Sequence, residues 1–508
     1  MSELVNLKDP TDVIVVGAGN AALCAAISAH EHGAKVAILE AAPAESRGGN
    51  SRFTGGAYRF AYNGIEDLQQ ICTDMTDQEI NDVDYGTYTE EQYFDDMFEL
   101  TKFRTDPDLC EILIRNSFET AKWASKQGVK LRPGLGRQAF KVNGKFKFWG
   151  GLALHIWGGG EELMGALYNN AEDRGIPILY ETPALSLIQD GDRVCGVNIM
   201  HQGKQIALHS KAVILACGGF ESNPQMRAQY LGKNWDVAKV RGTEFNMGAG
   251  LKMAMDIGAQ PHGNWSGCHS VAWDVNAPAY GDLDIGDQFQ KHNYPFGIIV
   301  NANGERYVDE GANFHSHTYA KYGGMILQQP DMNVWQIFDS KVTHLLRSEY
   351  RIRRVTKVEA NTIEELAEKL EGTNSKAVIK TIEEFNAACR TDIEFNPNIH
   401  DGRCTEGLEI NKTNWANPID QPPFHAFHVT TGVTFTFGGV KVTKDAQIEH
   451  QFKGAIPGLY AAGEMVGGLF FDNYASGTGL MSGAVFGRIA GRSAAMSASK
   501  SKPGGSNG

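Results

Sequence analysis

The N-terminal part of the chain alternates short apolar runs with an amphipathic stretch. Val13–Val16 and Val36–Leu39 are apolar runs of strand length. Between them, Ala21–Ser28 consists mostly of small residues, with Leu23 and Ile27 four positions apart on one face. Short apolar runs favour buried strands, whereas a four-residue spacing favours a helix. The pattern therefore predicts a strand, a helix and a second strand over residues 12–40.

Longer helices and a group of strands follow. The apolar spacing predicts helix over roughly residues 90–128 and over Glu161–Asp173, which ends at Arg174-Gly175. Strands are predicted at Ile178–Tyr180, Arg193–His201, Gln205–Leu208 and Lys211–Ala216, the last of them buried.

From about residue 265 to 420 the chain becomes rich in aromatic residues, His, Asn and Pro. Here we expect a strand at Phe296–Asn301 and helices at Ile363–Leu370 and Ser375–Arg390. A last helix is expected at Leu480–Ala495. The domain prediction is a first domain made of residues 1–264 and 421–496, an inserted cap domain at 265–420, and a disordered tail at 497–508, where Ser, Lys and Gly dominate.

Composition limits the classes of function. The chain has 508 residues and a net charge of −13, which argues against nucleic acid or an anionic membrane surface as a partner. Its eight cysteines form no CxxC pair, so we expect no metal centre and no disulfide framework. Met1–Pro10 is polar and no run of about 18 apolar residues exists, so we expect a cytoplasmic protein without a membrane span.

The 58 glycines gather at particular turns, and the first of these turns has dinucleotide-site spacing. In Gly17-Ala-Gly19-Asn-Ala-Ala22, Gly17 permits the turn and Gly19 lets the backbone approach a pyrophosphate. Ala22 replaces a third glycine with another small residue. Glu40 follows the second strand, 23 residues after Gly17, where a carboxylate binds ribose hydroxyls. We therefore predict a dinucleotide site.

Two further segments indicate that the predicted dinucleotide is FAD. Arg47–Gly56 contains paired glycines beside Asn50 and Ser51, which suit contacts to a flavin ring near N5. Glu464 follows an apolar strand and suits the ribityl hydroxyls, and Gly477–Gly479 opens the last helix. The N-terminus of that helix stabilises negative charge on a reduced flavin. The full set of predicted FAD-binding residues is Gly17, Gly19, Asn20, Ala21, Glu40, Gly48, Gly49, Asn50, Ser51, Gly55, Gly56, Ala216, Gly218, Gly463, Glu464, Ser476, Gly477, Gly479 and Leu480.

On these motifs the chain resembles the fumarate reductase/succinate dehydrogenase flavoprotein superfamily. Within it, the chain is most similar to FAD-dependent tricarballylate dehydrogenases. Other matching segments are Tyr294–Asn301, Gly304–Glu310 and Ser482–Gly487. The resemblance implies an α/β fold, in which a Rossmann-like FAD-binding domain carries an inserted α+β cap domain. It also implies dehydrogenation or reduction of a C–C bond next to a carbonyl. Covalent flavin in this superfamily uses a His that Gly49–Thr54 lacks, so we expect non-covalent FAD.

The same resemblance locates four polar anchors of the substrate site, and this chain keeps one. The first clamp His is retained as His269, whereas Phe314, Phe435 and Tyr474 occupy the positions of the active-site Arg, the second His and the clamp Arg. Tyr474 is similar to the Tyr with which 3-ketosteroid dehydrogenases polarise a ketone. The predicted catalytic residues are His269, Tyr474, His315 and His317, the last two as proton carriers beside the lost Arg.

Three hypotheses about the function stay open at this point. The first is an oxidoreductase that acts on a tricarballylate-like polycarboxylate. The second is an oxidoreductase that acts on a more apolar ketone or enone. The third is a flavoprotein in which FAD is structural. The chain has no second dinucleotide motif, so a small-molecule substrate and an unidentified electron donor or acceptor are expected as partners.

Overall fold

The computed structural model describes residues 11–148 and 151–500, and its first layer is an eight-stranded sheet. Strand β1 (Thr11–Val16) lies at the centre, between the parallel strands β11 (Lys204–Leu215) and β2 (Val36–Leu39). The path continues through β19 (Gly454–Ala461) and β18 (Gln447–His450) on one side and β8 (Ile178–Leu179) on the other. Two antiparallel strands, β9 (Ala184–Asp190) and β10 (Arg193–His201), extend from β11. The predicted α/β class is confirmed.

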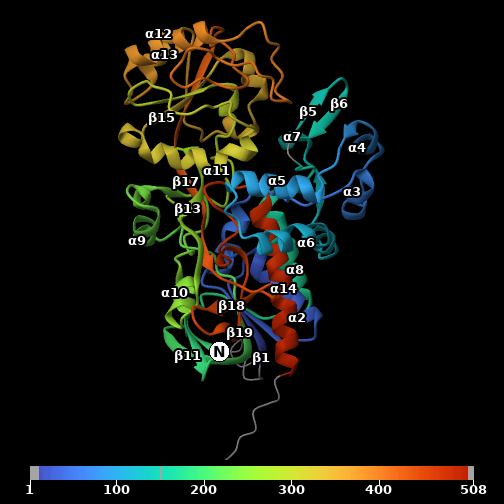
Figure 1. Ribbon diagram of the computed structural model, residues 1–508. Coiled ribbons are helices and arrows are strands. Elements are labelled where there is room, and N and C mark those ends of the chain that lie inside the picture. The colour runs from blue at the N-terminus through green and yellow to red at the C-terminus, as the bar shows by residue number, and fades with distance from the viewer. Residues whose placement is uncertain (1–10, 149–150, 501–508) are drawn as a thin grey trace, which may run out of the picture.

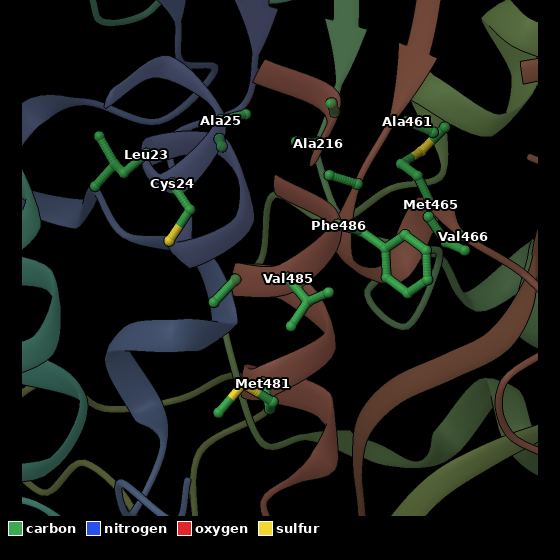
Figure 2. Packing of buried hydrophobic residues seen from close by; sticks show 14 of the residues in the cluster. Leu23, Cys24, Ala25, Ala216, Ala461, Met465, Val466, Met481, Val485 and Phe486 are labelled. Atoms are coloured by element: carbon green, nitrogen blue, oxygen red, sulfur yellow. The ribbon is translucent and has the colours of Figure 1, made fainter. Parts of the chain in front are cut away.

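Helices α2 (Asn20–Glu31) and α14 (Thr478–Lys500) pack closely along this sheet, although they come from opposite ends of the chain (Figure 1). Small residues permit the contact: a Cβ at Gly487 would lie 2.5 Å from the Ala21 carbonyl oxygen, and one at Gly491 would lie 2.2 Å from that of Ala25. Figure 2 shows the apolar packing around this contact, with Cys24 opposite Val485 and Met481. The packing of α2 against α14 therefore joins the N-terminal and C-terminal parts of the chain in one domain.

A second, six-stranded sheet forms the next layer, and its long strands β13 (Pro261–Asp274) and β17 (Phe424–Val440) pair antiparallel. The sheet also contains β12 (Lys239–Val240), β14 (Ile298–Asn301), β15 (Val334–Phe338) and β16 (Lys357–Ala360). Helices α11 (His315–Met325), α12 (Ile363–Lys369) and α13 (Ser375–Ala388) accompany it, α12 and α13 at the far end of the molecule from the first sheet (Figure 1). The sheet uses strands from both sides of residues 265 and 420, and the predicted domain boundaries stay a prediction.

The remaining helices and strands connect and cover the two large sheets. The helices are α3 (Ile65–Ile71), α4 (Asp77–Asn81), α5 (Glu90–Leu100), α6 (Pro107–Lys126), α7 (Leu135–Gln138), α8 (Gly159–Asp173), α9 (Pro224–Met226) and α10 (Ala249–Asp256). Two small sheets contain β3 (Val83–Asp84), β5 (Ala139–Val142) and β6 (Lys145–Phe148) in one, and β4 (Leu131–Pro133) and β7 (Leu154–Ile156) in the other. In the described part of the chain, no helix has the length and apolarity that crossing a membrane requires.

Some sequence predictions differ from the structure in detail. The helical stretch predicted over 90–128 is confirmed, and it consists of two helices, because the Asp106 side chain caps a new helix by accepting from the amides of Asp108 and Leu109. Strand β9 was missed, and β11 runs unbroken through two predicted strands. The last helix reaches Lys500, so residues 497–500 are not disordered. Residues 1–10 and 501–508 lie outside the described residues.

Candidate functional site

A single long pocket runs from the carboxyl end of the first sheet to the second sheet, and most of the predicted site residues line it. At one end are Gly17, Glu40 and Ala216, and at the other are His269, His315 and Tyr474. Two predicted cofactor residues, Gly48 and Gly56, are not among the lining residues. Of the four predicted catalytic residues, His317 is the one outside the pocket.

The first end of the pocket has the shape of a dinucleotide cradle. Gly17 connects β1 to α2 with a φ of +103°, and a Cβ there would lie 2.4 Å from the Ala216 carbonyl oxygen. Only glycine fits such a conformation and approach. Glu40 follows β2 and is buried, with one carboxylate oxygen accepting from the Ala42 amide at 2.8 Å. Burial raises the pKa of Glu40 above its ordinary value. The predicted turn and acid therefore meet at one edge of the sheet.

The loop predicted to lie near flavin N5 forms a short 3-10 helix, Gly49–Phe53, held by its polar side chains. Asn50 donates to Glu221 at 2.6 Å and to the Thr434 carbonyl at 2.5 Å, and its oxygen accepts from the Thr243 amide at 2.9 Å. Ser51 accepts from the Asn20 amide at 3.2 Å. These contacts fix the position of the loop, and Gly49, Asn50 and Ser51 line the pocket.

The predicted Tyr474 lies in the loop just before α14. Its hydroxyl oxygen accepts from the Gly479 amide at 3.0 Å, in the first turn of the helix. The side chain is buried, and burial raises the pKa of Tyr474 above 10.0. Tyr474 is therefore a neutral phenol at neutral pH. Since the amide already occupies one lone pair, the phenolic proton remains available to donate.

Aromatic rings form one wall of the pocket around His269. The His269 ring stacks on Phe435, its partner across β13 and β17, with centroids 5.2 Å apart and an 18° interplanar angle. Tyr319 and Tyr474 meet the same ring edge-on at 4.9 Å and 4.8 Å. His269 is 1% exposed, and burial lowers its pKa well below 6.5, so the ring is neutral. Its Nδ1 has no hydrogen-bond partner among the described residues.

Polar groups that sequence reasoning missed complete the same end of the pocket. Arg241 lines it and contacts Asp287 at 2.6 Å, so its charge is balanced locally. Arg347 also lines it, and its Nη2 lies 2.7 Å from His315 Nε2. Because a guanidinium only donates, that nitrogen of His315 accepts and its ring proton sits on Nδ1. The two arginines come from outside every motif, so no local signal marked them.

A second histidine, His292, also lines the pocket. His292 is 3% exposed and packs against the Tyr319 ring at 4.7 Å. Its Nε2 has no hydrogen-bond partner among the described residues. Burial lowers the pKa values of His292 and His315 well below 6.5, so both rings are neutral. This end of the pocket thus combines aromatic surface, neutral imidazoles and two arginines, each beside a carboxylate: Asp287 is 2.6 Å from Arg241, and Glu349 is 3.9 Å from Arg347.

Other residues singled out from the sequence lie elsewhere. His317 is 3.7 Å from Asp96, and burial lowers its pKa to about 4. Phe314 precedes α11 and stacks on His400 at 4.5 Å. Arg306 binds the buried Glu310 with two hydrogen bonds, of 3.0 Å and 2.5 Å, and this pairing gives it a structural role.

Residues 12–480 of this sequence match the FAD binding domain family. The chain belongs to that family. Its cofactor is therefore FAD, and the protein is an FAD-dependent oxidoreductase. The residues fit this cofactor. A Cβ at position 17 would collide with the Ala216 carbonyl, so the turn has room for a ligand only with glycine there. The pocket continues from the buried Glu40 to the first turn of α14. Glu40 would hold the adenosine ribose, the Gly17 turn the pyrophosphate, and the loop at Gly49–Phe53 the flavin.

Relatives of this chain differ in length and in named substrate. The NADH:fumarate oxidoreductase of Klebsiella pneumoniae (strain 342) is 27% identical over 493 residues, which cover 94% of this chain and 46% of that protein. The chain thus spans about half the length of that relative. The vinyl phenol reductase of Lactiplantibacillus plantarum is 28% identical over 506 residues, with 92% of each chain covered. Both relatives are oxidoreductases by name.

Solved structures share the fold at lower identity. The open conformation of a flavocytochrome c3 fumarate reductase matches with a TM-score of 0.73 and 23% identity, covering 98% of this chain and 80% of that chain. The 3-ketosteroid delta1-dehydrogenase from Sterolibacterium denitrificans matches with a TM-score of 0.73 and 20% identity, covering 96% and 100%. The prediction of the wider flavoprotein superfamily is confirmed, and the finer likeness to tricarballylate dehydrogenases stays a prediction.

Proposed function

We propose that the protein transfers a hydride between FAD and a C–C bond next to a carbonyl group in a flat, largely apolar substrate. FAD supplies the hydride acceptor or donor at N5. The observation that carries the proposal is the wall made by His269, Phe435 and Tyr474, with ring centroids about 5 Å apart. A flat conjugated molecule stacks on such a wall, whereas a polycarboxylate needs several unbalanced cations instead.

The residues of this wall suggest separate roles. In the reducing direction a hydride adds to the β-carbon, a proton adds to the α-carbon, and negative charge develops on the carbonyl oxygen in between. The Tyr474 hydroxyl, held by the Gly479 amide, is placed to donate a hydrogen bond to that oxygen. The neutral His269 and His292 offer further donors, and His315 orients Arg347. His317 faces Asp96 and has no role in this proposal.

The names of two similar proteins support this substrate class. A vinyl phenol reductase and a ketosteroid dehydrogenase are named for ring-containing substrates, and the reductase has nearly the same length as this chain. A tricarballylate-like acid is the second candidate, because Arg241 and Arg347 both line the pocket. The pairings of Arg241 with Asp287 and of Arg347 with Glu349 weigh against it, since each carboxylate offsets charge that would bind an acid.

Substrate-induced shifts in thermal stability separate the two candidates. Purified FAD-loaded protein is heated with a panel of aryl-substituted enones and steroid ketones, and with tricarballylate and related acids. We expect stabilisation by the conjugated ketones or enones, because a ligand that binds only the folded state raises the melting temperature. Stabilisation by the polycarboxylates alone would remove the aromatic-wall proposal and favour the second candidate.

A further inference from the structure

Two buried carboxyl groups meet beside the FAD pocket, and sequence reasoning used only one of them. Glu221 follows β11, and Glu464 follows β19 in the short 3-10 helix Gly463–Met465. Strands β11 and β19 are parallel neighbours in register at Leu215 and Ala461. The segments after their carboxyl ends therefore emerge side by side, which brings the two glutamates together at the edge where the cofactor binds.

Each carboxyl group has one oxygen held by the protein. Glu221 Oε1 accepts from the side-chain amides of Asn50 at 2.6 Å and Asn246 at 2.5 Å. Glu464 Oε1 accepts from the amide of Thr436 at 2.6 Å and from its hydroxyl at 2.9 Å. Glu221 is 0% exposed, and its Oε2 meets no N–H or O–H donor among the described residues.

The two carboxyl groups lie beside each other, because the Thr436 hydroxyl that donates to Glu464 at 2.9 Å also accepts, at 3.4 Å, from the amide of Phe220, the residue before Glu221. Two carboxylates have only acceptor oxygens, so a hydrogen bond between them requires a proton on one partner. Two ionised carboxylates in contact would repel each other, and the buried site would not offset that repulsion. We propose that Glu221 and Glu464 share one proton, and that this protonated acid pair positions Glu464 and the Asn50 loop for FAD.

The groups around the acid pair do not supply a charge that would replace the proton. Arg227 is the nearby cation, and its guanidinium donates to the main-chain oxygens of Glu221, Trp235, Asp236 and Ala238 rather than to either carboxyl group. The other titratable neighbours are the thiols of Cys217 and Cys268. Burial raises the pKa of each thiol, so both are neutral at neutral pH.

The shared proton makes the FAD site sensitive to alkaline pH. Burial first, and then the opposing Glu464, raise the pKa of Glu221 well above 4.5, and burial also raises the pKa of Glu464. The unfolded chain releases both protons above about pH 4.3, whereas the folded protein keeps one. Stability from this proton is therefore complete at low pH and is lost as pH rises through the raised pKa. Above it the pair is doubly negative, and repulsion between the two carboxylates displaces Glu464 and the Asn50 loop bound to Glu221.

Replacing Glu221 by Gln tests this inference without any substrate. A Gln at 221 reproduces the protonated acid, because its oxygen accepts from Asn50 and Asn246 while its NH₂ donates to Glu464. We would measure the dissociation constant for FAD by flavin fluorescence from mildly acidic to alkaline pH. The wild type is expected to lose up to about tenfold in affinity per pH unit above the pKa of the pair. Glu221→Gln is expected to stay flat, and a profile parallel to the wild type would overturn the proposal.

A second measurement keeps the inference testable if the variant does not fold. Infrared spectroscopy of wild-type protein without FAD at neutral pH should show the carbonyl stretch of a protonated carboxylic acid, and that band should disappear at alkaline pH. Absence of the band at neutral pH contradicts a shared proton. Glu359→Gln is the control, because it removes a half-exposed carboxylate of β16 outside the pocket and should leave the band and the pH dependence of FAD affinity in place. Neither measurement depends on the proposed substrate.

Discussion

Replacing Tyr474 by Phe is the most direct perturbation of the proposed chemistry. The variant keeps the ring that packs against His269 at 4.8 Å and removes only the hydroxyl that accepts from the Gly479 amide. If that hydroxyl donates to the reacting carbonyl oxygen, its loss costs about 10²–10³-fold in rate, or roughly 2.7–4 kcal/mol of transition-state stabilisation. Leaving the Gly479 amide without its acceptor lowers the free energy of unfolding by about 1–3 kcal/mol.

The assay must separate these two effects. Anaerobic stopped-flow measurement of the flavin absorbance gives the rate constant of hydride transfer at saturating substrate, and FAD titration and thermal melting report the structural cost. Tyr319→Phe is the matched control, because Tyr319 also lines the pocket but its hydroxyl donates to Ser476 at 3.3 Å. We expect a large rate loss in Tyr474→Phe and a small one in Tyr319→Phe. An unchanged rate constant in Tyr474→Phe would refute the donor role and leave Tyr474 as a packing residue.

Three further predictions concern the cofactor and the fold. Glu40→Ala should weaken FAD binding by about 10–100-fold, since a charge-assisted hydrogen bond is worth about 1.5–3 kcal/mol, and normal occupancy in a flavin fluorescence titration would contradict its ribose role. Acid precipitation of the holoprotein should release all of the flavin to the supernatant, whereas a flavin-weight mass increase on the denatured chain would show a covalent bond. Arg306→Ala should lower the free energy of unfolding by about 3–5 kcal/mol, because it leaves the Glu310 carboxylate buried without its partner. Denaturant titration measures that loss, and an unchanged midpoint would mean that the ion pair contributes nothing.

Much of the first sheet could be predicted because its signals are local. The apolar run at Val36–Leu39 is strand β2, and the Gly17 turn lies where the spacing places it. The break between α5 and α6 also had a local signal, since Asp106 before Pro107 is a helix-start pattern that the apolar spacing obscured. Both cases depend on residues a few positions apart.

The polar end of the pocket could not be predicted in the same way. Arg241 and Arg347 reach it through long-range packing, and neither belongs to a motif. His315 and His317 show the limit of sequence neighbours: residues two apart on a helix face different directions, so one lines the pocket and the other meets Asp96. Glu221 had a weak signal, as an acid directly after a buried strand and a Gly-Gly turn.

Anaerobic reaction of the reduced holoprotein with a conjugated enone tests the central claim most directly. FAD in the purified protein is reduced with dithionite, mixed with flat aryl-substituted or steroid enones, and followed by absorbance and product analysis. The proposal predicts that the flavin becomes oxidised in step with one equivalent of product saturated at the C–C bond next to the carbonyl. The claim is contradicted if no such acceptor oxidises the reduced flavin and no corresponding saturated ketone reduces the oxidised flavin.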